Sequence, residues 1–224
     1  MRELLQELQF RVRAGPARAT RWIFDRLTDR AQDRRFGIET AGTVHTNLGS
    51  RDFVHYQPVS YRDLAESLAL AKLTPDDVFL DAGCGMGRAV CVAATYPLRR
   101  VIGVELSPDL CRVARENIAR IEHKLACRDV QIVNANALEY GIPPDVSLLF
   151  LFNPLSGAAL CNFFARVRDS CRQHPRGLRV LFTGTVSSIH FEQQAHAYSF
   201  LQLVSKQVLS TGARALLYNV QDQP

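Results

Sequence analysis

Residues 78–106 read VFLDAGCGMGRAVCVAATYPLRRVIGVEL, and this stretch decides the fold. An apolar run at 78–83 is followed by a glycine-rich turn, a segment of helical pattern at 88–96 and a second apolar run at 101–106. A strand, a turn, a helix and another strand in this order form the βαβ unit of a parallel sheet. Neither run alternates apolar with polar residues, so both strands are expected to be covered on both faces.

The same alternation continues towards the C-terminus. Ser107 is expected to cap the next helix and Pro108 to occupy its first position. Further strands are predicted at three apolar runs, 129–135, 146–152 and 178–185. A helix from about Ser156 should present Leu160, Phe163, Phe164 and Val167 on one side. The pattern as a whole predicts an α/β fold with a doubly wound, mostly parallel sheet.

The two ends of this α/β region have their own patterns. Ser60 is a suitable N-cap for a helix that runs to about Lys72, with Leu64 and Leu68 on its apolar face. At the other end, 200–209 and 213–220 are two strand-like runs joined by a short turn, which predicts an antiparallel hairpin.

The first part of the chain differs from the rest, and we expect two units: an N-terminal helical cap with a lid loop at 1–59, and a domain at 60–224. Residues 1–35 have a helical pattern with a break near Gly15 and Pro16, whereas 36–59 lack helical periodicity. The apolar stripe of the cap is predicted to be Trp22, Ile23, Phe24 and Leu27. Aspartates interleave with arginines on the same helix, a pattern typical of a solvated face: Asp25, Asp29 and Asp33 with Arg26, Arg30 and Arg34.

Composition excludes several classes of protein. The chain has 224 residues, 47% of them hydrophobic and 22% charged, which is typical of a globular protein. No apolar run approaches the ~20 residues of a membrane span, and the N-terminus lacks a secretory signal pattern, so a cytoplasmic location is expected. The six cysteines form no CxxC pair and are expected to be reduced core residues. The net charge of +5 is concentrated in the cap, but the signs are interspersed, and we do not expect a nucleic-acid partner.

The glycine-rich turn, DAGCGMG at residues 81–87, is the first candidate binding element. Ligands of open parallel sheets lie beyond the carboxyl ends of the strands, where this turn begins. It does not fit the dinucleotide fingerprint GxGxxG/A, because Arg88 or Val90 stands at the sixth position, and it lacks the lysine of a phosphate P-loop. Glu105 ends the next strand, and its carboxylate has two oxygens that can accept hydrogen bonds from the two hydroxyls of a ribose.

DAGCGMGR followed by VIGVELSPDL resembles motif I and the ribose-binding acidic motif of class I, seven-strand S-adenosylmethionine-dependent methyltransferases. The resemblance extends from about Tyr56 to Val220. It implies S-adenosyl-L-methionine as the cofactor and a sheet of order 3-2-1-4-5-7-6 with strand 7 antiparallel. It also implies that the turn contacts the methionine part of the cofactor and that Glu105 contacts the ribose. The expected cofactor-binding residues are Tyr56, Asp81, Gly83, Cys84, Gly85, Gly87, Glu105, Leu106, Asn136 and Ala137.

One member of this set, Asn136, departs from the family pattern, and another, Tyr56, is included on the basis of a short resemblance. The family usually has an acidic residue beside the adenine, where this chain has Asn136, whose amide oxygen can still accept a hydrogen bond. Tyr56-Gln57-Pro58 resembles a segment that precedes motif I in small seven-strand lysine methyltransferases of the Dot1-like type. A plain packing role for this aromatic beside a proline is the alternative.

The candidate catalytic residue is Asn153, which follows the strand at 146–152. Asn153-Pro154 resembles the Asn/Asp-Pro-Pro-aromatic motif of amino-group methyltransferases but lacks the second proline and the aromatic residue. Alternatively, this pair only ends the strand and initiates a turn. His190 or His196 could serve as a general base, although structural or surface roles are commoner for histidine. No metal site is expected, because Asp145 lies at the opening of its strand, away from the ligand edge.

From these residues we expect an S-adenosylmethionine-dependent methyltransferase that acts on a nitrogen of a protein lysine or of an amine metabolite. One alternative is an O-methyltransferase of a small metabolite. Another is a catalytically inactive protein that binds the cofactor and uses its basic arm to contact a partner. The sequence leaves the methyl acceptor and the oligomeric state open.

Overall fold

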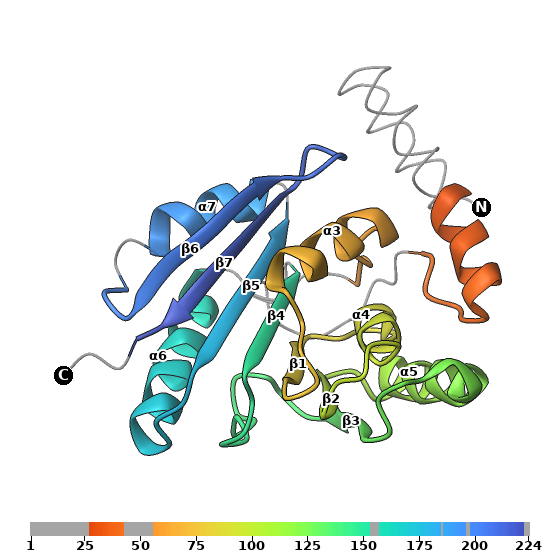
Figure 1. Ribbon diagram of the computed structural model, residues 1–224, viewed down its shortest axis with the longest axis horizontal. Coiled ribbons are helices and arrows are strands. Elements are labelled where there is room, and N and C mark those ends of the chain that lie inside the picture. Colours follow the sequence, from red (N-terminus) through yellow and green to blue (C-terminus); the bar gives the residue numbers. More distant parts are fainter. Residues whose placement is uncertain (1–26, 43–55, 153–156, 185, 196–197, 222–224) are drawn as a thin grey trace.

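The computed structural model describes residues 27–42, 56–152, 157–184, 186–195 and 198–221. For residues 186–190 it describes the backbone but not the side chains. Its centre is a seven-stranded sheet of order β3-β2-β1-β4-β5-β7-β6 (Figure 1). The pairs from β3 to β5 are parallel, whereas β7 runs antiparallel to both of its neighbours. The sheet order that the family resemblance implies and the antiparallel orientation of strand 7 are both confirmed.

The strands lie where the apolar runs predict them. They are β1 (Val78–Ala82), β2 (Arg100–Glu105), β3 (Val130–Asn134), β4 (Leu148–Phe152), β5 (Leu178–Gly184), β6 (Leu201–Val208) and β7 (Arg214–Val220). Asp81 pairs with Gly103 of β2 on one side and with Phe150 of β4 on the other. This register brings the carboxyl ends of β1, β2 and β4 to one edge of the sheet, which is where a ligand is expected.

The helices are α3 (Tyr61–Ala71), α4 (Arg88–Ala93), α5 (Pro108–Arg120), α6 (Gly157–Gln173) and α7 (Val186–Ala195), with a short 3₁₀ helix at Glu122–Lys124. The predicted caps are confirmed: Ser60 accepts a hydrogen bond from the Asp63 N–H at the start of α3, and Ser107 accepts one from Leu110 at the start of α5. The sequence does not predict α7, because its residues form no apolar stripe of helical period.

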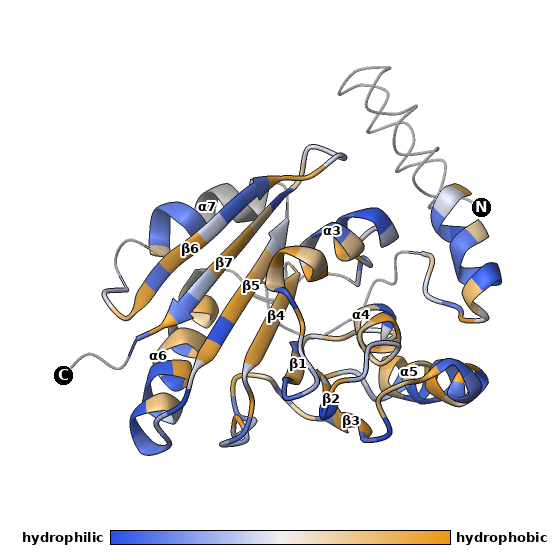
Figure 2. Ribbon diagram, viewed as in Figure 1, coloured by the Kyte–Doolittle hydropathy of each residue, from blue (hydrophilic) through white to orange (hydrophobic). Residues whose placement is uncertain are grey.

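Two apolar cores lie on opposite faces of the sheet because successive strand side chains point to opposite sides. Val78 and Leu80 of β1 join the core under α6 and α7, whereas Phe79, between them, packs in the core under α3 and α4. Figure 2 shows β4, β5 and β7 as mostly hydrophobic, whereas α5 carries both hydrophobic and hydrophilic residues. All six cysteines are free thiols, and only Cys161 is exposed. Among the described residues, no helix is both long and apolar enough to cross a membrane.

The start of the described chain differs from the predicted solvated helix. Residues 27–36 are helical, but Asp29 and Asp33 do not interleave with arginines on an exposed face. Both carboxylates instead turn inward to the buried Arg88 of α4, at 2.6 and 3.5 Å. An ion pair to a residue distant in the sequence outcompetes the local pairs because burial removes the water that screens a charge at the surface.

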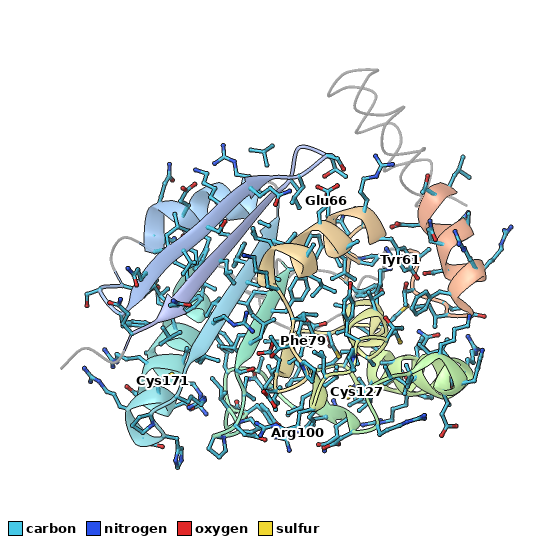
Figure 3. All side chains as sticks on the ribbon, in the orientation of Figure 1. Tyr61, Glu66, Phe79, Arg100, Cys127 and Cys171 are labelled. Atoms are coloured by element: carbon cyan, nitrogen blue, oxygen red, sulfur yellow. The ribbon has the colours of Figure 1, made fainter. Side chains whose placement is uncertain are left out.

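The other predictions for this segment have mixed outcomes. Leu27 is 60% exposed and so contributes little to an apolar stripe. Trp22, Ile23, Phe24, Asp25 and Arg26 lie outside the described residues, as does 43–55 of the predicted lid loop. Figure 3 labels Tyr61 on the side of α3 that faces the helical residues 27–36.

Candidate functional site

The glycine-rich turn connects β1 to α4 in a conformation that requires its glycines. Gly83, Gly85 and Gly87 have φ angles of +89°, +54° and +83°, in a region that residues with a side chain rarely adopt. The N–H groups of Gly83 and Cys84 donate to the Val104 carbonyl of β2, at 2.8 and 3.0 Å. The turn is therefore held against the end of β2, where Glu105 lies.

Glu105 is buried and ties the turn to the start of α5. One of its carboxylate oxygens accepts from the Gly85 N–H at 2.9 Å, and the other accepts from the Ser107 N–H at 2.8 Å. Burial raises the pKa of Glu105, and these backbone hydrogen bonds oppose the rise. A carboxylate offers about four acceptor positions, and backbone N–H groups of Ser107, Gly85 and Leu106 interact with this one, so it retains capacity for a further donor. A ribose hydroxyl is a donor that suits the remaining position.

Asp81, at the end of β1, is the most unusual group of the site. Its side chain is only 4% exposed, yet no hydrogen-bond donor to its carboxylate occurs among the described residues. Burial, with the nearby charge of Glu105, raises the pKa of Asp81 to about 8. A buried carboxylate without a partner is costly unless a ligand supplies one. The two acids together therefore favour a ligand that combines a cationic group with neighbouring hydroxyls.

Tyr56 covers the middle of the glycine turn. A Cβ atom added at Gly85 would lie 2.2 Å from Cε2 of the Tyr56 ring, so the ring packs directly on this glycine. The Tyr56 hydroxyl donates to the Thr40 carbonyl at 2.8 Å. The structure thus brings Tyr56 together with Gly85 and, through the Gly85 N–H, with Glu105.

The remaining members of the expected set lie at the same edge. Cys84 is buried, and burial raises the pKa of its thiol well above the usual value. Leu106 follows β2, and its carbonyl and that of Glu105 accept from the Asn134 side chain at 2.9 and 3.0 Å. Asn136 follows β3. Its amide oxygen accepts from the Leu138 N–H at 3.0 Å, which stabilises the turn that contains Ala137.

Asn153 lies outside the described residues, as do Pro154 and His196. His190 belongs to α7, but its side chain is not described. The strand before Asn153 is β4, which pairs with β1 and β5. Asp145 precedes β4 at the opposite edge and pairs with Arg100, as its position in the sequence indicates. Among the described residues, no cluster of three metal-ligating side chains occurs.

Sequence reasoning missed the residues that support the turn from behind. Arg88 is the last residue of the DAGCGMGR motif, and the sequence pattern gives it no role of its own, but it is 2% exposed and ion-paired. Asn117 of α5 is fully buried and donates to the Met86 carbonyl of the turn at 2.9 Å. The sequence contains one signal for such a buried ion pair. Arg88 is followed by the apolar run AVCVAA, and two aspartates lie four positions apart on another helix.

A separate concave region of about 480 Å³ lies between α5 and β3 and is lined by Ile118, Leu125, Val130 and Ile132 among others. Neither the glycine turn nor Glu105 contributes to its lining. It is therefore distinct from the site formed at the carboxyl edge of β1 and β2.

Comparison with known proteins agrees with this geometry. Residues 79–174 match the family model described as a methyltransferase domain. The match contains both the glycine turn and Glu105. Together with the order of the sheet, it gives the chain the class I, seven-strand methyltransferase fold, as the sequence motifs predict.

Individual relatives are similar over part of their length. A protein-lysine N-methyltransferase of Saccharolobus islandicus is 32% identical over 90 residues, which are 40% of this chain and 54% of that protein. A trans-aconitate 2-methyltransferase of Methylobacterium radiotolerans is 30% identical over 105 residues, which are 43% of this chain and 40% of that protein. The matches thus span about half of these relatives.

A solved structure supports the fold alone. It is an S-adenosylmethionine-dependent O-methyltransferase from Thermotoga maritima, and it is 15% identical in sequence. The superposition has a TM-score of 0.58 and covers 80% of this chain and 70% of that one.

Proposed function

We propose that this protein is an S-adenosylmethionine-dependent methyltransferase that acts on a nitrogen. The observation that carries the proposal is the pair of buried acids beside the glycine turn: Asp81, to which the described residues supply no hydrogen-bond donor, and Glu105, which backbone N–H groups hold in place and which can still accept from a ribose hydroxyl. A cofactor that has an ammonium group and a ribose diol matches this pair in charge and in hydrogen bonding. A pyrophosphate dinucleotide does not, because two adjacent carboxylates repel phosphate.

The residues of the chain have distinct roles in this proposal. Glu105 accepts the hydrogen bonds of the ribose hydroxyls, while its bonds to Gly85 and Ser107 keep its carboxylate in place. Asp81 accepts from the ammonium group and becomes ionised. Gly83 allows the backbone to approach the methionine part closely, whereas the missing side chain at Gly85 leaves room for the Tyr56 ring that covers the turn. Asn136 and Ala137 lie beside the adenine.

When bound, S-adenosylmethionine supplies a methyl group on a positively charged sulfur, a leaving group that needs no further activation. The contribution of the protein is therefore mainly alignment of the acceptor with the methyl group. We assign that role to Asn153, the next residue in the sequence after β4, a strand that pairs in parallel with β1. Its amide oxygen accepts a hydrogen of the target nitrogen, and the lone pair of that nitrogen then points at the methyl group.

Two observations support a nitrogen acceptor. Asn153-Pro154 retains part of the amino-group methyltransferase motif. In addition, one relative with 32% identity is named a protein-lysine N-methyltransferase. An alkyl ammonium has a pKa of about 10.4 and must lose a proton before it can attack. His190 and His196 are the candidates for accepting that proton.

The cofactor half of the proposal is tested by calorimetric titration of the full chain with S-adenosylhomocysteine. Glu105→Gln removes the charge that the ribose contacts, and Glu116→Gln, on the exposed side of α5, is the matched control. We expect binding to weaken at least tenfold in the first variant and to stay at the wild-type value in the second. Equal affinity in all three proteins would contradict the role of Glu105.

The acceptor half is tested with methyl-labelled cofactor and fractionated cell extract, followed by identification of the labelled product. Label on an amine nitrogen that is lost in Asn153→Ala, with cofactor affinity unchanged, supports the proposal. Label on oxygen contradicts it.

A second candidate is methyl transfer to an oxygen of a small metabolite. The relative named a trans-aconitate 2-methyltransferase favours this alternative. Incubation with a panel of small carboxylic acids and alcohols, followed by mass spectrometry, separates it from the first: a methyl ester or ether as the main product identifies the oxygen acceptor.

A further inference from the structure

Arg88 is a buried cation directly behind the cofactor turn. It begins α4, one residue after Gly87, and its side chain is 2% exposed. Its Nη1 donates to Asp29 at 2.6 Å and to the Val59 carbonyl at 2.8 Å. The guanidinium carbon lies 4.5 Å from the centre of the Tyr61 ring. Arg88 therefore joins the turn to residues that lie far ahead of it in the sequence.

Asp33 fixes the chain that follows the helical residues 27–36. One oxygen of its carboxylate accepts from the backbone N–H groups of Thr40 and Ala41, both at 2.6 Å. The other oxygen accepts from the Thr40 hydroxyl at 2.7 Å and from the Tyr61 hydroxyl at 2.6 Å. Arg88 Nη2 lies 3.5 Å from the same oxygen. A buried carboxylate with this many donors holds Thr40 in a single position.

Thr40 passes this constraint to the cofactor turn. Its hydroxyl oxygen accepts from Arg88 Nε at 2.7 Å, and its carbonyl accepts from the Tyr56 hydroxyl at 2.8 Å. The Tyr56 ring packs on Gly85, whose N–H donates to Glu105. A continuous series of contacts therefore runs from Arg88 through Thr40 and Tyr56 to Gly85.

Asn117 makes a second attachment, one residue away from Thr40. Its side-chain oxygen accepts from the Glu39 N–H at 2.9 Å, and its amide nitrogen donates to the Glu39 carbonyl at 3.0 Å. The same nitrogen donates to the Met86 carbonyl of the glycine turn at 2.9 Å. Residues 39 and 40 are thus bound to the turn from both α4 and α5.

We propose that Arg88 and Asn117 are positioning residues for the cofactor: they fix residues 39–40, and thereby Tyr56, against the glycine turn, and so maintain the conformation that binds S-adenosylmethionine. This inference rests on the proposed function. It makes cofactor affinity depend on residues 27–42, which lie outside the 79–174 segment that matches the methyltransferase domain. The described part of the N-terminal segment then belongs to the cofactor site.

The main test compares the buried Arg88 with Arg179, a half-buried arginine that is also ion-paired, in the full chain. Arg88→Met removes the cation behind the turn. Arg179→Met is the matched control, because Arg179 also pairs with a buried aspartate, Asp77, at 2.6 Å, but at the opposite edge of the sheet. We expect both variants to unfold at lower urea concentrations. Only Arg88→Met should bind S-adenosylhomocysteine at least tenfold more weakly, and only this variant should show faster hydrogen exchange at residues 83–87 without ligand.

A milder variant separates positioning from folding. Tyr56→Phe keeps the ring on Gly85 and removes only the hydroxyl that donates to Thr40. We expect affinity for S-adenosylhomocysteine to fall about fivefold, the equivalent of one hydrogen bond of ~1 kcal/mol. If Arg88→Met does not fold, Tyr56→Phe and Thr40→Val decide the outcome, since Thr40→Val removes the contact to Arg88 without changing a charge.

The outcomes distinguish this inference from the proposed function. Wild-type protein that binds S-adenosylhomocysteine, with Arg88→Met and Tyr56→Phe weakened and Arg179→Met unchanged, supports both. Wild-type affinity in Arg88→Met and Tyr56→Phe, or equal weakening in Arg179→Met, overturns the positioning role and leaves the proposed function intact. Absence of binding by the wild type overturns the proposed function and, with it, the inference.

Discussion

Replacing Asp81 with asparagine should flatten the dependence of stability on pH. The Asp81 carboxyl group is buried, and burial together with the charge of Glu105 raises its pKa from 3.8 to about 8. Between these two values the folded chain retains a proton that the unfolded chain has already lost. The stability of the wild type therefore falls as the pH rises through this window, and the loss is complete only above the folded pKa.

The size of the effect follows from the linkage relation. One proton of difference changes the free energy of unfolding by ~1.4 kcal/mol per pH unit. Between about pH 5 and pH 7, Asp81 should thus lower the stability of the wild type by about 2.5 kcal/mol. Asparagine has no titrating proton and lacks this slope. Its buried amide has no partner among the described residues, but the neutral Asp81 carboxyl group has no donor there either, so the two proteins should be about equally stable near pH 5 and the variant should be the more stable one at about pH 7 and above.

The assay is urea unfolding of both proteins at several pH values between about 5 and 8. Cys84→Ala is a suitable control, because burial raises the pKa of the Cys84 thiol well above its usual value and keeps it neutral throughout. The Cys84→Ala variant should differ in stability from the wild type by the same amount at every pH, so that the two curves of stability against pH are parallel. If the curves of Asp81→Asn and the wild type were parallel as well, the raised pKa of Asp81 would be refuted.

Three further predictions concern packing, the second attachment and the ligand. Gly103→Ala should lower stability by about 1–3 kcal/mol, because the new Cβ would lie 2.7 Å from Cys84 Sγ and 2.8 Å from Val90 Cγ2; an unchanged urea midpoint would contradict the packing of β2. Asn117→Ala removes the three hydrogen bonds to the Glu39 and Met86 backbone, together with a long one from Arg120, and should cost at least ~2 kcal/mol. A thermal melt within error of the wild type would refute that. S-adenosylhomocysteine at a hundredfold excess over its Kd should raise the free energy of unfolding by about 2.7 kcal/mol. The same concentration of NAD should leave the melting temperature unchanged. Stabilisation by NAD instead would contradict the assignment of S-adenosylmethionine as the cofactor.

Local signals predicted the elements of the fold well. Ser60 and Ser107 cap α3 and α5 as the sequence indicates, because an N-cap depends on a serine and on the backbone N–H groups next to it. The buried strands follow from their uninterrupted apolar runs. The sheet order came from the family resemblance, since the periodicity of single strands does not determine which strands become neighbours. Helix α7 lacks an apolar stripe, so its sequence contains no periodic signal to find.

Contacts between distant residues account for what the sequence did not predict. Asp29 and Asp33 have arginines nearby in the sequence, and the apolar run after Arg88 indicates a buried arginine without showing that these two aspartates turn to it. The choice depends on burial, which is decided by the packing of the N-terminal segment on α4. The position of Asp81 and Glu105 follows from the strand ends that motif I and its partner define. The contact of Tyr56 with Gly85 required the structure.

A crystal structure of the protein with S-adenosylhomocysteine tests the central claim most directly. The account predicts the ribose hydroxyls within hydrogen-bond distance of the Glu105 carboxylate and the amino group of the ligand on Asp81, with the Tyr56 ring still on Gly85. A ligand bound elsewhere, or a ribose that does not contact Glu105, would contradict it.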